Sequence, residues 1–443
     1  MSEHSQAVAA LRDQYAAIPA GSPVRLAKPT SNLFRFRDAQ AGGLDVARFD
    51  RVLSVDRDAR TAQVQGMTTY ENLVDATLPH GLMPLVVPQL KTITLGGAVA
   101  GLGIESSSFR NGLPHESVRE LEVMTGDGEV VVVEPGDDLF RGFPNSYGTL
   151  GYALRLEIEL EPVSRYVRLR HVPFGSAAEC AEVISAVCAD RSYQGEPVDF
   201  VDGTVFSAGE QYLTLADWVD EAPFTSDYTG NGIYYRSVQR ERVDYLTARD
   251  YLWRWDTDWF WCSRAFGAQR PLIRRLWPKK YLRSDVYRRI VAWDRRTGFS
   301  GKLSKAVQEP VIQDVEIPVA RLAEFLDYFH REVGIEPVWL CPLRLRGADA
   351  WPLYPMDPGE LYVNVGFWST VDLRPGEEMG SRNRSIEAKV TELGGHKSLY
   401  SDSYYGEEEF WEHYNGGIYQ ELKKRYDADG RLPDLYAKCV LRR

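Results

Sequence analysis

The chain has 443 residues, a formal net charge of −11, and hydrophobic and charged fractions of 44% and 26%. This length exceeds what one hydrophobic core usually organises, so we expect two domains, and the composition argues against extensive disorder. The negative charge argues against a nucleic-acid partner, because phosphate binding needs a basic surface field.

The five cysteines are an odd number, widely spaced and without a CxxC pair. This pattern favours free thiols in a reducing compartment over a metal site or a disulfide framework. No stretch reaches the roughly 18 apolar residues of a spanning helix, and the first residues lack a secretory signal. We therefore expect a cytoplasmic protein with no metal and no transmembrane segment.

Residues 50–162 combine short β-rich runs with turn signals. ENLVDATLPHG (71–81) predicts a helix that ends at Gly81. The GDG at Gly126–Gly128 separates two apolar runs, as in a β-hairpin whose glycine takes a positive φ. Apolar residues then alternate in YALRLEIELEPV (152–163), which predicts a strand with one buried face. This part of the chain is expected to be α+β.

After Pro162 the segments become longer and mixed, which places a domain boundary near residue 164. AAECAEVISAVCADR (177–191) and ARLAEFLDYFHREVG (320–334) predict helices, and EPVWLCPLRLR and LYVNVGF predict strands. A sheet backed by helices is the usual form of a domain that covers a substrate. The charged tail, residues 407–430, is expected to be helical.

The loop TLGGAVAGLGIESSSFRNG (94–112) is rich in glycine and serine. Such a density of glycine lets backbone N–H groups approach a phosphate closely, and Ser106, Ser107 and Ser108 add hydroxyl donors. The same glycine pattern also occurs in tight helix packing. Its late position does not fit a Rossmann unit, whose glycines directly follow the first strand.

The loop and several sequence segments that follow it resemble a known family. TLGGAVAGLGIESSSFRNGL is followed, in this order, by SYGTLGYALRLEIELEPV, PVWLCPLRL, ELYVNVG and LYSDSYYGEEEFWEHYNGGIYQELKKRY. From about Val52 to Cys439 the chain resembles the FAD-binding vanillyl-alcohol oxidase and p-cresol methylhydroxylase superfamily. Within it, the chain is similar to the 24-dehydrocholesterol reductase (delta24-sterol reductase) family.

The resemblance implies an α+β fold with a two-part FAD-binding domain and an inserted α+β cap domain. We expect residues 1–163 to form the FAD-binding domain, 164–400 the cap that holds the substrate, and 401–443 a segment that returns to the FAD site. The implied cofactor contacts are Thr94, Gly96, Gly97, Gly101, Gly103, Ile104, Glu105, Ser106, Ser107, Gly112, Gly148, Leu150, Tyr414 and Lys423. Relatives with covalent flavin at the first loop read RGGGHS, whereas KPTSNLFRF (28–36) has no histidine, so we expect non-covalent FAD.

The resemblance also implies reduction of an isolated carbon–carbon double bond, with hydride from NADPH or NADH. Protonation of such a bond at its less substituted carbon leaves a tertiary cation, which then takes the hydride. A methylene branch on a fatty acyl chain and the side-chain alkene of a sterol both fit. The start lacks the hydrophobic anchor of the animal sterol enzymes, so the acyl chain is the favoured substrate and the sterol the alternative. A flavin oxidase or dehydrogenase of another small substrate is a further alternative.

The general acid must lie within hydrogen-bond reach of the alkene. The candidates are Tyr400, Asp402 and Tyr404 in LYSDSYY, Glu105 in the glycine loop, and His396. Each has a structural alternative: a carboxylate can order a loop or cap a turn, and an aromatic ring can simply pack in the core.

Three further residues are expected near the reacting groups. Trp339 and Phe367 in the cap are candidates for the substrate pocket, although both also suit ordinary core packing. In the tail, Lys423 could stabilise an anionic reduced flavin or could remain solvated on a helical face.

Residues 251–296 are basic in an acidic chain, with twelve Lys or Arg against four Asp, and they include several tryptophans. Tryptophan and lysine together are typical of a membrane interface. We expect a lipid substrate and a peripheral contact with the cytoplasmic face of a membrane through this segment. A cap surface whose arginines pair with acids is the alternative, and the oligomeric state is left open.

Overall fold

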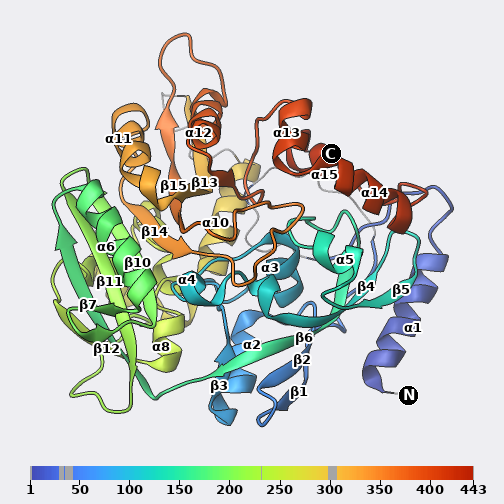
Figure 1. Cartoon of the computed structure of the whole chain (residues 1–443), viewed down its shortest axis with the longest axis horizontal. Helices are drawn as coiled ribbons and strands as arrows, with labels where there is room; N and C mark the ends of the chain where they lie inside the picture. Colours follow the sequence, from blue (N-terminus) through green and yellow to red (C-terminus); the bar gives the residue numbers. More distant parts are fainter. Residues whose placement is uncertain (1, 29–33, 35–42, 231, 298–306, 443) are drawn as a thin grey trace.

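The computed structural model describes residues 2–28, 34, 43–230, 232–297 and 307–442. Its fold is α+β and contains two large antiparallel sheets, one built from early strands and one from later strands (Figure 1). Among the described residues, no helix is both long enough and apolar enough to cross a membrane.

The first sheet has the order β1-β2-β6-β4-β5, and β3 pairs with β6. Its strands are β1 (Val52–Asp56), β2 (Thr61–Gln65), β3 (Leu82–Pro84), β4 (Val118–Met124), β5 (Val130–Val133) and β6 (Tyr152–Pro162). The central strand β6 buries every second residue, including Leu156 and Ile158, as the alternation in the sequence predicts. The expected hairpin joins β4 to β5, with Gly128 at a φ of 82°.

The second sheet has the order β12-β7-β11-β10-β14-β15-β13-β16. Its strands are β7 (Tyr166–Phe174), β10 (Phe200–Ser207), β11 (Glu210–Val219), β12 (Val243–Thr247), β13 (Gln308–Pro318), β14 (Val338–Leu343), β15 (Tyr362–Asp372) and β16 (His396–Lys397). A separate hydrophobic core lies under it and includes residues of the helices α6 (Ala177–Asp190) and α11 (Leu322–Glu332). The chain passes from the first sheet to the second between Pro162 and Tyr166.

The end of the chain returns to the first sheet. Its helices are α13 (Glu407–His413), α14 (Gly416–Tyr426) and α15 (Leu435–Cys439), and α14 lies beside α5 (Asp138–Gly142) (Figure 1). The backbone N–H of Val24 donates to the carbonyl of Arg431 at 2.8 Å, so the two ends of the described chain are joined.

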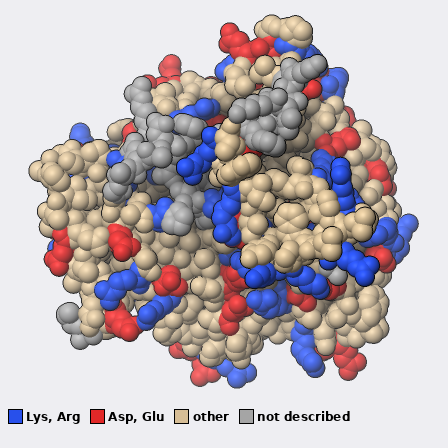
Figure 2. Space-filling model, turned by 180° about the vertical axis from the view of Figure 1, so that it is seen from behind, with Lys and Arg blue, Asp and Glu red and all other residues tan. Residues whose placement is uncertain are grey.

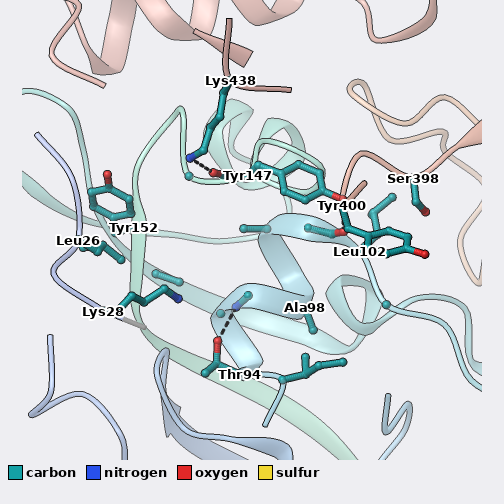
Figure 3. A pocket seen from close by; sticks show the side chains of 18 of the residues that line it. Leu26, Lys28, Thr94, Ala98, Leu102, Tyr147, Tyr152, Ser398, Tyr400 and Lys438 are labelled. Atoms are coloured by element: carbon teal, nitrogen blue, oxygen red, sulfur yellow. Dashed lines mark hydrogen bonds between the residues drawn. The ribbon is translucent and has the colours of Figure 1, made fainter. Parts of the chain in front are cut away.

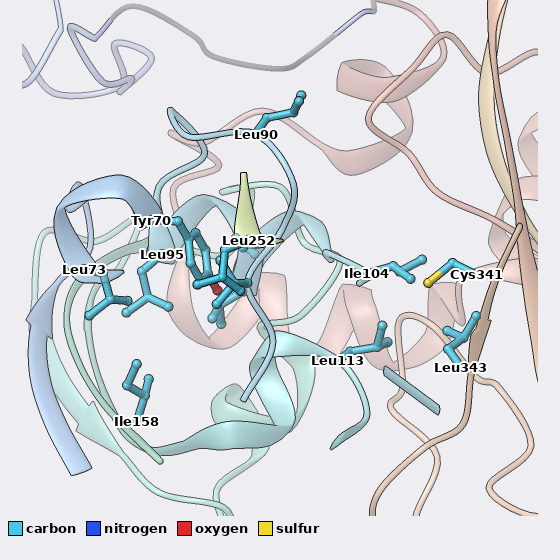
Figure 4. Close-up of a cluster of buried hydrophobic side chains, with 14 of the residues drawn as sticks. Tyr70, Leu73, Leu90, Leu95, Ile104, Leu113, Ile158, Leu252, Cys341 and Leu343 are labelled. Carbon is cyan, nitrogen blue, oxygen red and sulfur yellow. The ribbon is translucent and has the colours of Figure 1, made fainter. Parts of the chain in front are cut away.

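A second core joins the two sheets through the segment that follows the glycine-rich helix. Ile104 lies beside Cys341, and Leu113 points toward Leu343 (Figure 4). Cys341 and Leu343 belong to strand β14. The loop expected to bind the cofactor is therefore fixed between the sheets.

The tryptophans of the basic segment also belong to this core. Trp253, Trp255, Trp259 and Trp261 are each 6% exposed or less. The expectation that they lie at a membrane interface is wrong, because their rings pack inside the protein.

Candidate functional site

A cavity of about 570 Å³ lies where the first sheet, the second sheet and the C-terminal segment meet. Ligand sites in proteins usually enclose about 300–1,000 Å³. Its walls come from residues 23–28, 66–67, 88–104, 143–153, 259–260 and 430–442, together with single residues of strands β13 to β15 and with Phe34, Ser398 and Tyr400. Segments distant in the sequence therefore converge on one cavity.

Glycines form one wall of this cavity. A Cβ atom at Gly66 would lie 2.0 Å from the carbonyl oxygen of Ala153, and one at Gly96 would lie 2.7 Å from that of Gly66. Helix α3 (Leu95–Gly101) can approach strand β6 so closely only because these positions lack side chains. Thr94 caps the helix by accepting a hydrogen bond from the Gly97 N–H at 3.2 Å.

Basic side chains surround the part of the cavity near the chain ends. Those that line it are Arg25, Lys28, Arg431, Lys438 and Arg442, whereas Asp314 is the one acidic side chain among its described lining residues. Lys28 and Lys438 lie on the same side of the cavity as Tyr152 (Figure 3). Backbone contacts hold some of these cations: Lys438 Nζ donates to the carbonyl of Tyr147 at 2.5 Å. This charge suits an anionic group such as a diphosphate.

Aromatic side chains line the opposite part of the cavity, where Tyr400 and Ser398 lie (Figure 3). Phe34 stacks on Trp259 with 5.5 Å between ring centroids, and Phe260 stacks on Trp368 at 4.3 Å. Flat aromatic walls of this kind suit a planar ring system and an apolar substrate beside it.

One acid pair faces this aromatic part. The hydroxyl of Tyr400 lies near the carboxyl group of Asp314, and its oxygen accepts a hydrogen bond from Trp368 Nε1 at 2.9 Å. Burial raises the pKa of Asp314 to about 7, although the hydrogen bond from Asn364 and the nearby Tyr400 hydroxyl oppose the shift. The carboxyl of Asp314 is therefore partly protonated at neutral pH.

A second carboxyl lies two residues further along the same strand. Burial raises the pKa of Glu316 to about 8, and the charge of Asp314 adds to the shift. Glu316 accepts hydrogen bonds from Tyr354 and from Ser398, which itself lines the cavity. Strand β13 thus presents Asp314 to the cavity and holds Glu316 buried outside its lining, in contact with Ser398.

The structure brings many of the predicted site residues to the cavity. They are Thr94, Gly96, Gly97, Gly101, Gly103, Ile104 and Gly148 among the expected cofactor contacts, Trp339 among the substrate candidates, and Tyr400 among the acids.

Three predicted residues of the glycine loop point away from it. Glu105 forms a buried ion pair with Arg254 at 3.0 Å, and burial raises the pKa of its carboxyl. Ser106 bonds to Tyr251, and Ser107 donates to a backbone carbonyl. They secure the loop to its neighbours and do not line the cavity, so a catalytic role for Glu105 has no support from this geometry.

Other predicted contacts also lie outside the cavity. Leu150 and Phe367 are fully buried in hydrophobic cores, and Gly112 accommodates the side chain of Glu116. Tyr414 donates to the carbonyl of Lys397 at 2.8 Å. Their positions are explained by packing.

Expectations change for three more residues, all between residues 401 and 443. Lys423 donates to the carbonyl of Thr149 at 2.8 Å and pairs with Asp427. It therefore connects the tail to the segment before β6 and does not line the cavity. Asp402 pairs with Arg442 at 3.4 Å, and the backbone N–H of Tyr404 donates to Glu387. Neither Asp402 nor Tyr404 lines the cavity.

His396 is half-buried. Burial lowers its pKa to about 4, and its ring lies 5.4 Å from that of Tyr354. It is therefore neutral at physiological pH and packs as an aromatic ring.

Sequence reasoning missed the cations of the cavity and the carboxyl of Asp314. The cations come from both ends of the chain, so no local motif joins them. Asp314 did leave a signal, because DVE places two acids on one face of a strand. Most of the KPTSNLFRF loop, residues 29–33 and 35–36, lies outside the described residues, and the attachment of the flavin there stays a prediction.

Comparison with known proteins identifies the ligand class. Residues 14–134 match the FAD binding domain family. The chain is 28% identical to the delta(24)-sterol reductase of Homo sapiens over 87% of this chain and 75% of that protein. It is 27% identical to that of Arabidopsis thaliana over 91% of this chain and 77% of that protein.

A stretch of 145 residues is also similar to cytokinin dehydrogenase 9 of Oryza sativa, at 30% identity over 32% of this chain and 26% of that protein. A cavity with a glycine wall, basic side chains for a diphosphate and an aromatic part for a ring system fits FAD. The chain is an FAD-dependent oxidoreductase, and it is similar over most of its length to the delta(24)-sterol reductases.

Proposed function

We propose that this enzyme reduces an isolated carbon–carbon double bond of a lipid. Bound FAD would supply the hydride after taking it from NADPH or NADH. The observation that carries the proposal is the Asp314–Tyr400 pair, which sets a proton donor against the aromatic part of the cavity. An isolated alkene has no carbonyl to polarise, so its reduction needs such an acid.

The closeness of the two groups suggests how the proton moves. With Asp314 ionised, the Tyr400 hydroxyl can donate to the carboxylate and is then turned away from the substrate. With Asp314 protonated, the carboxyl can donate to the Tyr400 oxygen, and the hydroxyl proton is free to turn toward the cavity. Tyr400 then protonates the alkene carbon as it takes the proton of Asp314, and the carboxylate regains a proton from solvent.

Aromatic walls assist the same step. Protonation leaves a positive charge on the more substituted carbon until hydride arrives. Phe260, Trp339 and Trp368 line this space, and aromatic rings can stabilise a cation without reacting with it. Apolar rings also disfavour water, which would otherwise trap the cation as an alcohol.

The similarity to known proteins changes which candidate substrate we favour. Those with the broadest similarity are named for a sterol double bond, so we place the side-chain alkene of a sterol first. The methylene-branched acyl chain, which the sequence analysis favoured, becomes the second candidate.

Anaerobic rapid mixing tests the proposal in two steps. The first mixes the purified enzyme with NADPH or NADH and follows bleaching of the flavin absorbance. The second adds a sterol with a side-chain alkene, or a lipid with a methylene-branched chain, and follows the return of the absorbance and the saturated product. Reoxidation by either lipid supports the proposal, and the faster one identifies the substrate.

Two outcomes would contradict it. A flavin that neither nicotinamide bleaches, but that an alcohol or amine substrate reduces, indicates an oxidase or dehydrogenase. A colourless protein with no flavin indicates a binding protein that retains only the fold.

A further inference from the structure

Helix α9 (Pro271–Leu276) has its polarity reversed relative to an ordinary surface helix. Arg274 on its inner side is only 5% exposed, whereas Leu272 and Leu276 on its outer side are 77% and 80% exposed. Surface helices normally bury leucine and expose arginine. Two leucines one turn apart therefore form an apolar edge in solvent.

The buried arginine fixes this orientation. Its guanidinium contacts the carboxylate of Asp258 at 2.8 and 3.0 Å and donates to the carbonyl of Gly232 at 2.7 Å. A charged anchor of this kind is lost if the helix rotates, because the charge would be buried without a partner. The contacts of Arg274 thus hold the two leucines outward, so their exposure is a fixed feature of the fold.

The segment that follows extends the same surface. Tyr281, in the short turn Lys279–Tyr281, is 46% exposed, and Trp293 of α10 (Ser284–Thr297) is 56% exposed. The exposed basic side chains nearby in sequence are Arg270, Arg275, Lys279, Lys280, Arg289 and Arg296. On the face seen in Figure 2, Lys and Arg side chains border an area of uncharged surface.

We propose that this surface, here called the α9 surface, docks on a bilayer that contains anionic phospholipid. Leu272 and Leu276 would enter the boundary between headgroups and acyl chains, with Tyr281 and Trp293 at headgroup depth. The basic side chains would meet the lipid phosphates. Charge complementarity favours this partner. The whole chain has a net charge of −11 and is repelled by an anionic membrane, but the basic side chains of the α9 surface attract one.

This contact would also bring the lipid close to the cavity. Asp258, which anchors α9, directly precedes Trp259, whose ring is part of the aromatic wall. An enzyme that takes a membrane lipid gains from such an arrangement, but membrane docking does not depend on the reaction proposed above.

Vesicle binding tests the proposal without substrate or turnover. The purified full-length protein is sedimented with vesicles of phosphatidylcholine alone and with vesicles that also contain phosphatidylglycerol. We expect binding to the anionic vesicles, weakened by added salt. Leu272→Ser/Leu276→Ser should lower the affinity at least about tenfold, since each leucine contributes free energy on that scale when it leaves water.

Two further variants sharpen the test. Lys279→Glu/Lys280→Glu should reduce the preference for anionic vesicles. Val132→Ser, which alters a side chain 51% exposed on strand β5 of the other sheet, should bind as the unaltered protein does. All altered side chains are exposed, so each variant should keep its thermal unfolding midpoint.

Any of three results would overturn the proposal. The first is no binding to either kind of vesicle. The second is binding that the leucine substitutions leave unchanged. The third is a dimer in solution that Leu272→Ser/Leu276→Ser converts to a monomer, since the α9 surface would then be covered by a second copy of the chain.

Discussion

Arg254 is the residue whose loss should damage the fold most. Its side chain is fully buried and contacts two carboxylates, Glu105 at 3.0 Å and Asp202 at 2.8 Å. Its guanidinium also lies 4.0 Å from the ring centroid of Tyr251. The pair with Glu105 fixes the glycine loop, and the pair with Asp202 fixes strand β10, so one cation joins the cavity wall to the second sheet.

Arg254→Met keeps most of the side-chain volume and removes the charge. Breaking a buried ion pair by removing one partner costs about 3–5 kcal/mol, because the remaining charge has no compensation. Two carboxylates lose their cation here, so we expect the free energy of unfolding to fall by an amount in the upper part of that range.

Protonation of the carboxylates limits this cost and gives it a pH dependence. Burial already raises the pKa of Glu105, and Arg254 opposes that shift, so the variant should raise this pKa further. A raised folded-state pKa favours the folded protein at low pH and loses that benefit as pH rises. The difference in the free energy of unfolding between the variant and the unaltered protein should therefore grow from pH 5 toward pH 8.

A matched control lies in the same segment. Arg249 pairs with Asp75 through two contacts of 2.9 and 3.2 Å, but both side chains are nearly half exposed. Arg249→Met should cost about 1 kcal/mol or less. Urea denaturation of both variants at several pH values measures the difference. The reasoning is refuted if Arg254→Met costs no more than Arg249→Met, or if its cost does not change with pH.

Three further predictions concern the cavity. Gly66→Ala should lower the free energy of unfolding by about 1–3 kcal/mol and weaken FAD binding, because its Cβ would meet the Ala153 carbonyl; normal stability by denaturation would contradict this. Asp314→Asn should flatten the decline in stability that the unaltered protein shows as pH rises from about 4 to 7, leaving a smaller slope from Glu316, and an unchanged slope would contradict the raised pKa values. Tyr400→Phe should lower kcat for alkene reduction about 10²–10⁴-fold while nicotinamide still bleaches the flavin at its normal rate, and equal loss in both steps would indicate damage to the flavin site.

Local patterns predicted the elements of the fold well. The alternation in β6 and the hairpin at Gly128 follow from side-chain periodicity and from the positive φ of glycine, which act over a few residues. The pairing order of eight strands from residue 166 to residue 397 has no such local signal, because contacts between distant strands decide it.

The basic segment shows how the same residues can mislead. Tryptophan beside arginine suggested an exposed surface, but Trp253 and Trp255 are buried and Arg254 is neutralised by acids from other segments. Leu272 and Leu276, which no local pattern placed outside, carry the apolar surface together with Tyr281 and Trp293. Burial of a charge depends on a partner that folding supplies, and a single sequence does not reveal that partner.

Release of the flavin tests the central claim most directly. The account holds that one FAD occupies the cavity between the sheets without a covalent bond. Precipitating the purified protein with acid and measuring FAD in the supernatant should therefore recover about one FAD for each chain. A colourless protein, or flavin that stays with the precipitate, would contradict it.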